Sequence, residues 1–184
     1  MQANTTKTIT LLLGGARSGK SQFAQDRLTG EGRVAFIATA EGLDEEMRQR
    51  IARHRAERPA GWTTLEVPLE LEETILQCSG KFDVILVDCL TLWTSNLMMA
   101  EDSNIERISV RAAKFCDALR QVTCSVVLVS NEVGSGVVPA TDSGRLFRDL
   151  LGGVNRQVAA MADKVLLLVA GYPLVVKDTS ADDA

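Results

Sequence analysis

The chain has 184 residues, of which 46% are hydrophobic and 24% charged, and this length suits one globular domain with a sizeable core. Its net charge of -4 gives no overall attraction to nucleic acid, and no apolar stretch approaches membrane-spanning length. The polar N-terminal residues show no signal peptide, and the 4 cysteines have neither C-x-x-C spacing nor neighbouring histidines, so we expect a cytoplasmic protein with reduced thiols.

The predicted elements alternate between strands and helices. Apolar, β-branched runs predict strands over residues 9–13, 33–39, 63–67, 82–87 and 125–130. Helical spacing predicts helices over residues 18–28, 44–57, 69–77, 105–121 and 143–161, the last weakened by a glycine pair at 152–153. Residues 164–169 and 174–176 fit either a hairpin or two terminal strands. This alternation favours an α/β fold with a mainly parallel central sheet flanked by helices.

The whole chain is expected to form one domain. Its ordered core should cover about residues 8–177, while the first few residues and the acidic tail from Lys177 to Ala184 should be mobile. In a sheet of this kind, ligands bind at the carboxyl ends of the strands.

The phosphate-loop pattern G-x-x-x-x-G-K-[ST] directly follows the first predicted strand. It consists of Gly14, Gly15, Ala16, Arg17, Ser18, Gly19, Lys20 and Ser21. Backbone N–H groups of such a loop surround a di- or triphosphate, and the next helix adds its positive N-terminal end. We expect Lys20 to reach the β and γ phosphates and the Ser21 hydroxyl to ligate Mg²⁺. A glycine turn that matches by accident is the alternative, but the flanking strand and helix favour nucleotide binding.

Asp88 ends the apolar run of the fourth predicted strand. An acidic residue there is typical of a Walker-B carboxylate, which holds Mg²⁺ directly or through water. The alternative is a turn residue that caps the segment after it. Polar residues 130–134 follow the next strand and would face the same cleft, although a turn explains them equally well.

His54 is the only histidine, and helical spacing places it on a partly apolar helix face. Four arginines surround it, namely Arg50, Arg53, Arg55 and Arg58. Guanidinium groups suit phosphate, and a neutral imidazole among them is able to attack phosphorus and form a covalent phosphoramidate. The residues alone favour a half-buried structural histidine over a nucleophile, and the arginines could equally pair with glutamates on a solvated face.

Taken in order, these segments resemble the bifunctional adenosylcobinamide kinase/adenosylcobinamide-phosphate guanylyltransferase family of cobalamin biosynthesis. The resemblance runs from about Thr10 to Lys177. Besides the phosphate loop, it rests on residues 36–40, 44–47, 54–59, 62, 66, 87–91, 96–97, 130–134, 138–139, 147–149, 152, 155, 162–163 and 170–171.

The resemblance implies two reactions in one chain. First, the γ-phosphoryl group of ATP or GTP moves to the hydroxyl of the aminopropanol arm of adenosylcobinamide. Then GMP from GTP is joined to that phosphate, giving adenosyl-GDP-cobinamide and pyrophosphate. The resemblance also implies a RecA-like P-loop fold, Mg²⁺ as cofactor, a corrinoid as small-molecule partner, and assembly as a homotrimer.

The resemblance also assigns roles to residues. His54 would carry GMP covalently, with Lys20 as a second catalytic residue, and Ser21 and Asp88 would hold the metal. The nucleotide site would comprise the phosphate loop with Ala38, Thr39, Ala40, Arg55, Ala56, Glu57, Arg58, Glu66 and Asp88. Two positions depart from the family pattern: Gly153 stands where members often carry Arg, and Asp88 where some carry Glu. Some relatives lack the kinase step, so kinase activity needs its own test.

Two other functions fit the phosphate loop. One is a plain P-loop small-molecule kinase without nucleotidyl transfer, and the other is a RecA-like ATPase or regulatory nucleotide-binding module. A motor usually has polymer-binding loops, and this acidic chain has no basic tract for nucleic acid. If one triphosphate loop serves two phosphorus centres, either the nucleotide or the helix that carries His54 has to shift between steps.

Overall fold

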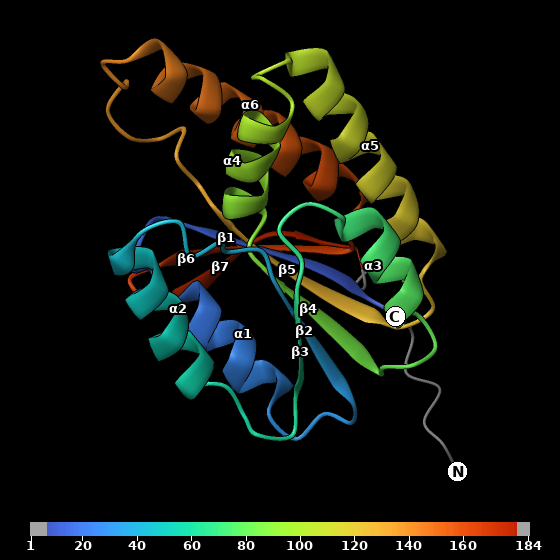
Figure 1. The fold of residues 1–184 in the computed structure, drawn as a ribbon. Coiled ribbons are helices and arrows are strands. Elements are labelled where there is room, and N and C mark those ends of the chain that lie inside the picture. The colour runs from blue at the N-terminus through green and yellow to red at the C-terminus, as the bar shows by residue number, and fades with distance from the viewer. Residues whose placement is uncertain (1–6, 180–184) are drawn as a thin grey trace.

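A computed structural model describes residues 7–179, which form a seven-stranded sheet with helices on both faces (Figure 1). The strands are β1 (Ile9–Gly14), β2 (Val34–Ala38), β3 (Thr63–Glu66), β4 (Val84–Asp88), β5 (Ser125–Asn131), β6 (Lys164–Val169) and β7 (Tyr172–Asp178). Their order in the sheet is β3-β2-β4-β5-β1-β6-β7. All neighbouring pairs are parallel except β6 and β7, which form an antiparallel hairpin.

The helices divide into two layers (Figure 1). Helices α1 (Lys20–Leu28) and α2 (Glu45–Ala56) lie on one face of the sheet. The other face is covered by α3 (Leu71–Cys78), α4 (Leu90–Ala100), α5 (Ile105–Gln121) and α6 (Asp142–Met161). Because parallel strands need long crossovers, a helix connects each strand to the next up to β6.

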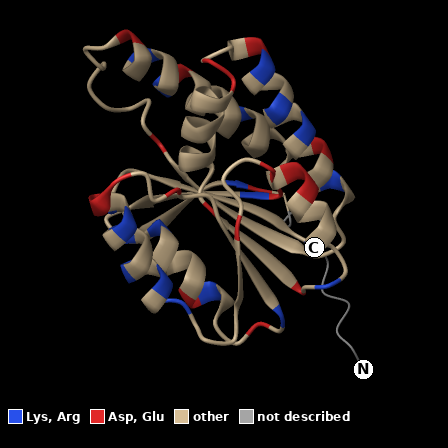
Figure 2. Ribbon diagram, viewed as in Figure 1, with Lys and Arg blue, Asp and Glu red and all other residues tan. Residues whose placement is uncertain are grey.

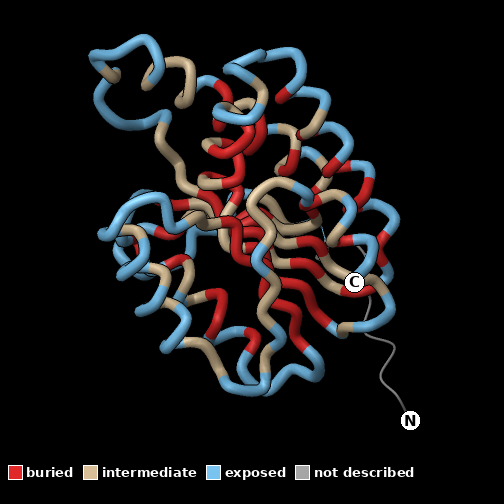
Figure 3. Tube along the Cα trace, in the orientation of Figure 1, coloured by how far each residue is buried: buried red, intermediate tan, exposed pale blue. Residues whose placement is uncertain are grey.

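The core consists of two apolar clusters, one on each side of the sheet. The larger lies under α3, α4, α5 and α6 and includes the fully buried Trp93 and Phe115, whose ring centroids are 5.2 Å apart. The smaller lies under α1 and includes Leu12, Ala24 and Phe36. Strand β2 is buried along its whole length, which explains its continuous apolar sequence (Figure 3).

The structure confirms the expected α/β class, and the shared elements begin and end within two residues of the predicted bounds. Residues 164–178 form the hairpin rather than two separate strands. Helix α6 runs unbroken through Gly152 and Gly153. The expected mobility from Lys177 onward is wrong for Lys177 and Asp178, which belong to β7. Thr179 is also described, and its N–H donates to the carbonyl of Asp163 over 3.0 Å. Residues 1–6 and 180–184 lie outside the described residues.

Helix α4 is the element that the sequence did not predict. Its buried residues are spread around the helix and include Leu90, Thr91, Trp93, Thr94 and Asn96. A helix that is enclosed on most sides has no polar face, so its sequence lacks the apolar periodicity of a surface helix. The reading of residues 89–91 as a turn capped by Asp88 is therefore wrong, because Cys89 is the N-cap of α4.

The expectation of reduced thiols agrees with the structure, in which Cys78, Cys89, Cys116 and Cys124 are free. Within residues 7–179, no helix is long and apolar enough to span a membrane.

Candidate active site

Strand register brings the predicted site residues to one edge of the sheet. Glu66 pairs with Ala38, and Ala38 pairs with Asp88. Gly14, the last residue of β1, pairs with Asn131 at the end of β5. Because these strands are parallel, their carboxyl ends lie at the same edge, where such sheets bind ligands. Backbone pairing alone therefore places the phosphate loop, Asp88 and Glu66 at the same edge of the sheet.

The phosphate loop connects β1 to α1. Gly19 is the N-cap of α1 and has a φ of 88°, a left-handed conformation that favours glycine. Lys20 is 8% exposed, and its Nζ donates a hydrogen bond of 2.9 Å to the carbonyl oxygen of Gly15. Desolvation lowers the pKa of the Lys20 ammonium, while Cys89 and Asp88 oppose that shift. The buried ammonium is thus held inside the loop, within reach of an anion that the loop would surround.

Ser21 and Asp88 meet across the space between α1 and β4. The Ser21 hydroxyl donates to Asp88 Oδ1 over 3.5 Å. Desolvation raises the pKa of the Asp88 carboxyl, although the nearby His54 and the Ser21 hydrogen bond favour its charged form. A raised carboxyl pKa inside a cleft is typical of functional sites.

The donor set at this point fits Mg²⁺. A hydroxyl and a carboxylate are both oxygen ligands, and Mg²⁺ in phosphoryl-transfer sites takes one or two protein ligands with water and phosphate oxygens. Among residues 7–179, no group of three or more His, Cys, Asp or Glu side chains is placed to hold a metal. Ser21 and Asp88 thus supply two oxygen ligands of the kind that Mg²⁺ takes in such sites.

Thr39 fixes the backbone that follows Asp88. Its fully buried hydroxyl donates to the carbonyl of Cys89 over 2.7 Å and accepts from the N–H of Cys89 over 2.9 Å. Asn96 Nδ2 of α4 donates to the carbonyl of Thr39 over 2.8 Å. Thr39 thus lies within the site without lining a cavity, and its side chain holds the ends of β2 and β4 together.

His54 lies near the C-terminal end of α2. This helix begins at Asp44, whose side chain accepts from the Met47 N–H over 2.7 Å, and it has no buried residue. The His54 side chain is 33% exposed, and its Nδ1 lies 3.9 Å from Glu57 Oε2. Glu57 thus faces Nδ1 rather than Nε2, the second ring nitrogen.

Figure 2 shows basic residues in blue along α2, and the arginines among them differ in their partners. Arg48 pairs with Glu45, and Arg55 pairs with Glu66. Within residues 7–179, Arg50 and Arg53 have no carboxylate partner within ion-pair distance, and both line the cleft beside the phosphate loop. The two free guanidinium groups are suited to phosphate.

Arg58 stacks on an aromatic ring at the base of the cleft. Its guanidinium carbon lies 3.9 Å from the centroid of Phe36, and its Nη1 donates to Thr64 Oγ1 over 3.4 Å. Trp62 stacks on Phe36 at 6.2 Å. Desolvation lowers the pKa of Arg58, while Asp88 opposes the shift. Arg58 is therefore a held cation, in contrast to Arg50 and Arg53.

Two adjoining cavities meet at His54. The larger, of about 660 Å³, lies between the phosphate loop and α2, and the smaller, of about 80 Å³, adjoins Asp88. Ser21, Arg50 and His54 line both. The larger is also lined by Ala16, Arg17, Ser18, Gly19, Lys20, Gln22, Gln25, Glu46, Gln49, Arg53, Glu57 and Asn131. The smaller is also lined by Ala38, Ala40, Met47, Ile51, Arg58, Glu66, Asp88, Cys89 and Leu92.

Most of the predicted site residues thus lie on one cleft. Gly14 and Gly15 support the loop, and a Cβ on Gly14 would approach the Leu168 carbonyl to 2.8 Å. Arg55 and Ala56 line neither cavity. Asn131 lines the cleft, as expected for the polar residues after β5. Gln22 and Gln25 line it without having been assigned to it, although helical spacing from Ser21 would have pointed to Gln25.

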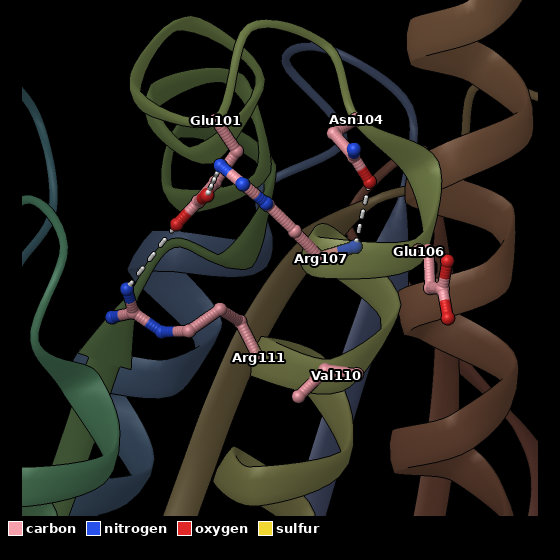
Figure 4. A pocket seen from close by; sticks show the side chains of 6 residues that line it. All are labelled: Glu101, Asn104, Glu106, Arg107, Val110 and Arg111. Atoms are coloured by element: carbon pink, nitrogen blue, oxygen red, sulfur yellow. Dashed lines mark hydrogen bonds and ion pairs between the residues drawn. The ribbon is translucent and has the colours of Figure 1, made fainter.

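A separate cavity of about 420 Å³ lies between the end of α4 and the start of α5 (Figure 4). Its lining comprises Glu101, Asn104, Glu106, Arg107, Val110 and Arg111. Arg111 also forms ion pairs with Glu70 and Glu72, so it connects α3, α4 and α5. The charged side chains around this cavity pair mainly with one another, which indicates a structural network.

The fold and the cleft define a P-loop nucleotide-binding protein. The sequence matches the family model described as "Cobinamide kinase / cobinamide phosphate guanyltransferase" over residues 10–176. The Pseudomonas aeruginosa "Bifunctional adenosylcobalamin biosynthesis protein CobP" is 43% identical over 169 residues, which cover 91% of this chain and 96% of that protein.

Two enterobacterial proteins are also similar. The proteins named "Bifunctional adenosylcobalamin biosynthesis protein CobU" of Escherichia coli and Salmonella typhimurium are 36% and 38% identical over 178 residues, which cover 91% of this chain and 98% of each relative. The chain therefore belongs to the cobinamide kinase/cobinamide phosphate guanylyltransferase family, as the sequence analysis expected.

Replacing Thr39 with Val should destabilise the protein. The change keeps the shape but removes the hydroxyl partner of the Cys89 N–H and C=O, of which only the C=O keeps another bond, from the Trp93 N–H. We expect a loss of about 1–3 kcal/mol in the free energy of unfolding, measured by urea denaturation. Thr39→Ser keeps the hydroxyl and should cost only about 0.5–1.5 kcal/mol for the lost methyl group. A Ser variant no more stable than the Val variant would contradict this role.

Proposed function

We propose that this protein phosphorylates adenosylcobinamide and then transfers GMP to the product during adenosylcobalamin biosynthesis. Family membership supports both activities. The single structural observation that carries the proposal is the position of His54 at the junction of two cavities, beside the phosphate loop. A plain kinase or a regulatory nucleotide-binding module has no need of a nucleophile there.

In the kinase step, the phosphate loop and Lys20 would bind the triphosphate of ATP or GTP. The hydroxyl of the aminopropanol arm attacks the γ-phosphorus, and the nucleoside diphosphate leaves. Mg²⁺ held by Ser21 and Asp88 would neutralise charge on the phosphate oxygens. The free guanidinium groups of Arg50 and Arg53 add positive charge to the wall that faces the loop.

In the guanylyl step, His54 Nε2 would attack the α-phosphorus of GTP. The bond to the bridging oxygen breaks, pyrophosphate leaves with the electron pair, and GMP remains joined to the histidine through a P–N bond. Glu57, which faces Nδ1 at 3.9 Å, favours the positive charge that the ring acquires. The corrinoid phosphate then attacks the same phosphorus and releases the imidazole.

A shift of α2 between the two steps would let one triphosphate loop serve both reactions. No residue of α2 is buried, so displacing the helix exposes little apolar surface. The phosphate loop, in contrast, continues directly from the buried strand β1. These features support movement of the histidine rather than of the loop.

The covalent relay predicts a labelled protein. After incubation with GTP labelled at the α-phosphate, we expect acid-labile, base-stable label on the wild-type chain, because a phosphoramidate behaves in this way. His54→Asn should carry no label but should still phosphorylate adenosylcobinamide. Arg48→Gln, which removes a charge from the same helix outside both cavities, should label normally. Label that persists in His54→Asn would exclude His54 as the nucleophile.

Lys20→Ala should impair both reactions. The buried ammonium is the cation inside the loop, and its loss should lower each rate by at least about a hundredfold. Rates of adenosylcobinamide phosphorylation and of histidine labelling measure the two effects. The control is Lys81→Ala, which changes an exposed lysine just before β4, at the end of that strand opposite to Asp88. Intact guanylylation in Lys20→Ala would show that the reactions do not share one triphosphate site.

We further propose that the enzyme is cytoplasmic and assembles as a homotrimer. Strand β7 is the last strand of the sheet and exposes Tyr172, Leu174, Val175 and Val176. An exposed apolar edge strand invites pairing with another chain.

Light scattering should give three times the chain mass of 19.9 kDa. Leu174→Lys should lower the molar mass, because it places a charge on the apolar edge. Val110→Lys, which changes an exposed valine of α5, should leave it unchanged. A monomeric wild-type protein would contradict the proposed homotrimer but not the two proposed reactions.

A further inference from the structure

The turn of the β6–β7 hairpin contacts the phosphate loop directly. Val169 pairs with Tyr172, so the turn consists of Ala170 and Gly171. Their φ angles are 51° and 87°, as a two-residue hairpin turn of type I′ requires. The N–H of Gly171 donates a hydrogen bond of 3.0 Å to the carbonyl oxygen of Ser18, in the middle of the phosphate loop.

The hairpin and the loop also approach each other closely on both sides of that bond. A Cβ on Gly19 would lie 3.4 Å from the Cα of Gly171, and one on Gly14 would lie 2.8 Å from the carbonyl of Leu168. Gly14 and Leu168 are partners in the parallel pairing of β1 and β6. The hairpin therefore forms a wall against which the loop lies.

The hydrogen bond from Gly171 fixes the orientation of one peptide unit. In a trans peptide, the carbonyl of one residue and the N–H of the next point in opposite directions. Since the Ser18 carbonyl points to the hairpin, the Gly19 N–H points away from it. Gly19 lines the large cavity, so an N–H that points away from the hairpin is placed to meet phosphate oxygens that the loop would hold. The Ser18 hydroxyl has no hydrogen-bond partner among the described residues, so it does not perform this task.

We propose that the β6–β7 turn is a positioning element of the phosphate loop, and that the Gly171 N–H orients the Ser18–Gly19 peptide for binding of a nucleoside triphosphate. The inference rests on the proposed nucleotide site, but not on the covalent histidine. It gives the last strand pair, which contributes no side chain to either cavity, a role in substrate affinity.

Gly171→Ala tests this role, because alanine disfavours a φ of 87° while space around the Cβ remains open. The altered turn should move the N–H away from Ser18. Gly171→Asn is the rescuing variant, since asparagine tolerates the left-handed region and keeps its N–H. Gly80→Ala is a matched control, because Gly80 also has a positive φ, of 75°, and open space around its Cβ. Gly80 precedes β4 and so lies at the edge of the sheet opposite to the phosphate loop.

The measurements are the affinity for a fluorescent GTP analogue with Mg²⁺, the melting temperature, and KM and kcat of the kinase reaction. We expect Gly171→Ala to weaken the affinity about tenfold, the equivalent of one N–H bond to phosphate, with a rise in KM. Gly171→Asn should bind nearly as the wild type does. Gly80→Ala should lower the melting temperature as Gly171→Ala does, without a change in affinity.

Unchanged affinity in Gly171→Ala, or an equal loss in Gly80→Ala, would overturn the inference. If Gly171→Ala does not fold, exchange of the Gly171 amide hydrogen in the wild type decides: protection that increases with GTP supports the role, and exchange indifferent to GTP overturns it. A wild-type chain that does not bind the analogue would refute the nucleotide site and this inference together. Binding without histidine labelling would contradict only the proposed guanylyl transfer.

Discussion

Parallel pairing of the central strands is the constraint on which the site depends. Glu66, Ala38 and Asp88 form one row across β3, β2 and β4, and Gly14 pairs with Asn131 across β1 and β5. A slip of one residue would turn every side chain of a strand to the other face. Strands β2 and β4 are apolar and buried, so such a slip would also disrupt the core. The energy that fixes the core therefore also fixes the distance between the phosphate loop and Asp88.

The cleft contains charged groups whose burial is not fully compensated by the protein. Desolvation lowers the pKa of Lys20 and raises that of Asp88, so burial disfavours the charged form of each group. A magnesium–triphosphate complex carries both signs of charge and would stabilise the ionised forms of both. The free guanidinium groups of Arg50 and Arg53 extend the positive wall. The site thus gives up part of its own stability for a ligand of matching charge.

The sequence was sufficient for the local features of the site but not for the contacts that hold it. The phosphate loop and Asp88 were predicted because each depends on a short motif or on its place at the end of an element, whereas His54 was assigned to the site through the family resemblance. The hydrogen bonds of the Thr39 hydroxyl were not predicted, because its partner Cys89 is 50 residues away in the sequence. Helix α4 was missed because its burial leaves no polar face. The hydrogen bond from Asn96 of α4 to Thr39 was therefore missed as well. The contact of Gly171 with Ser18 joins opposite ends of the chain, which no local pattern reveals.

Two kinds of support separate the parts of the site that are fixed from those that are free to move. The phosphate loop is bounded by backbone bonds: the Glu132 N–H donates to the Gly14 carbonyl, and the Gly171 N–H donates to that of Ser18. Helix α2 has no buried residue, and a cation–π contact of Arg58 and an ion pair of Arg55 hold the segment at its end. Displacing a loop bonded in this way would break these backbone hydrogen bonds, whereas displacing α2 would break mainly interactions of exposed side chains. If one triphosphate site serves two chemistries, moving the helix that carries His54 therefore costs less than moving the phosphate loop.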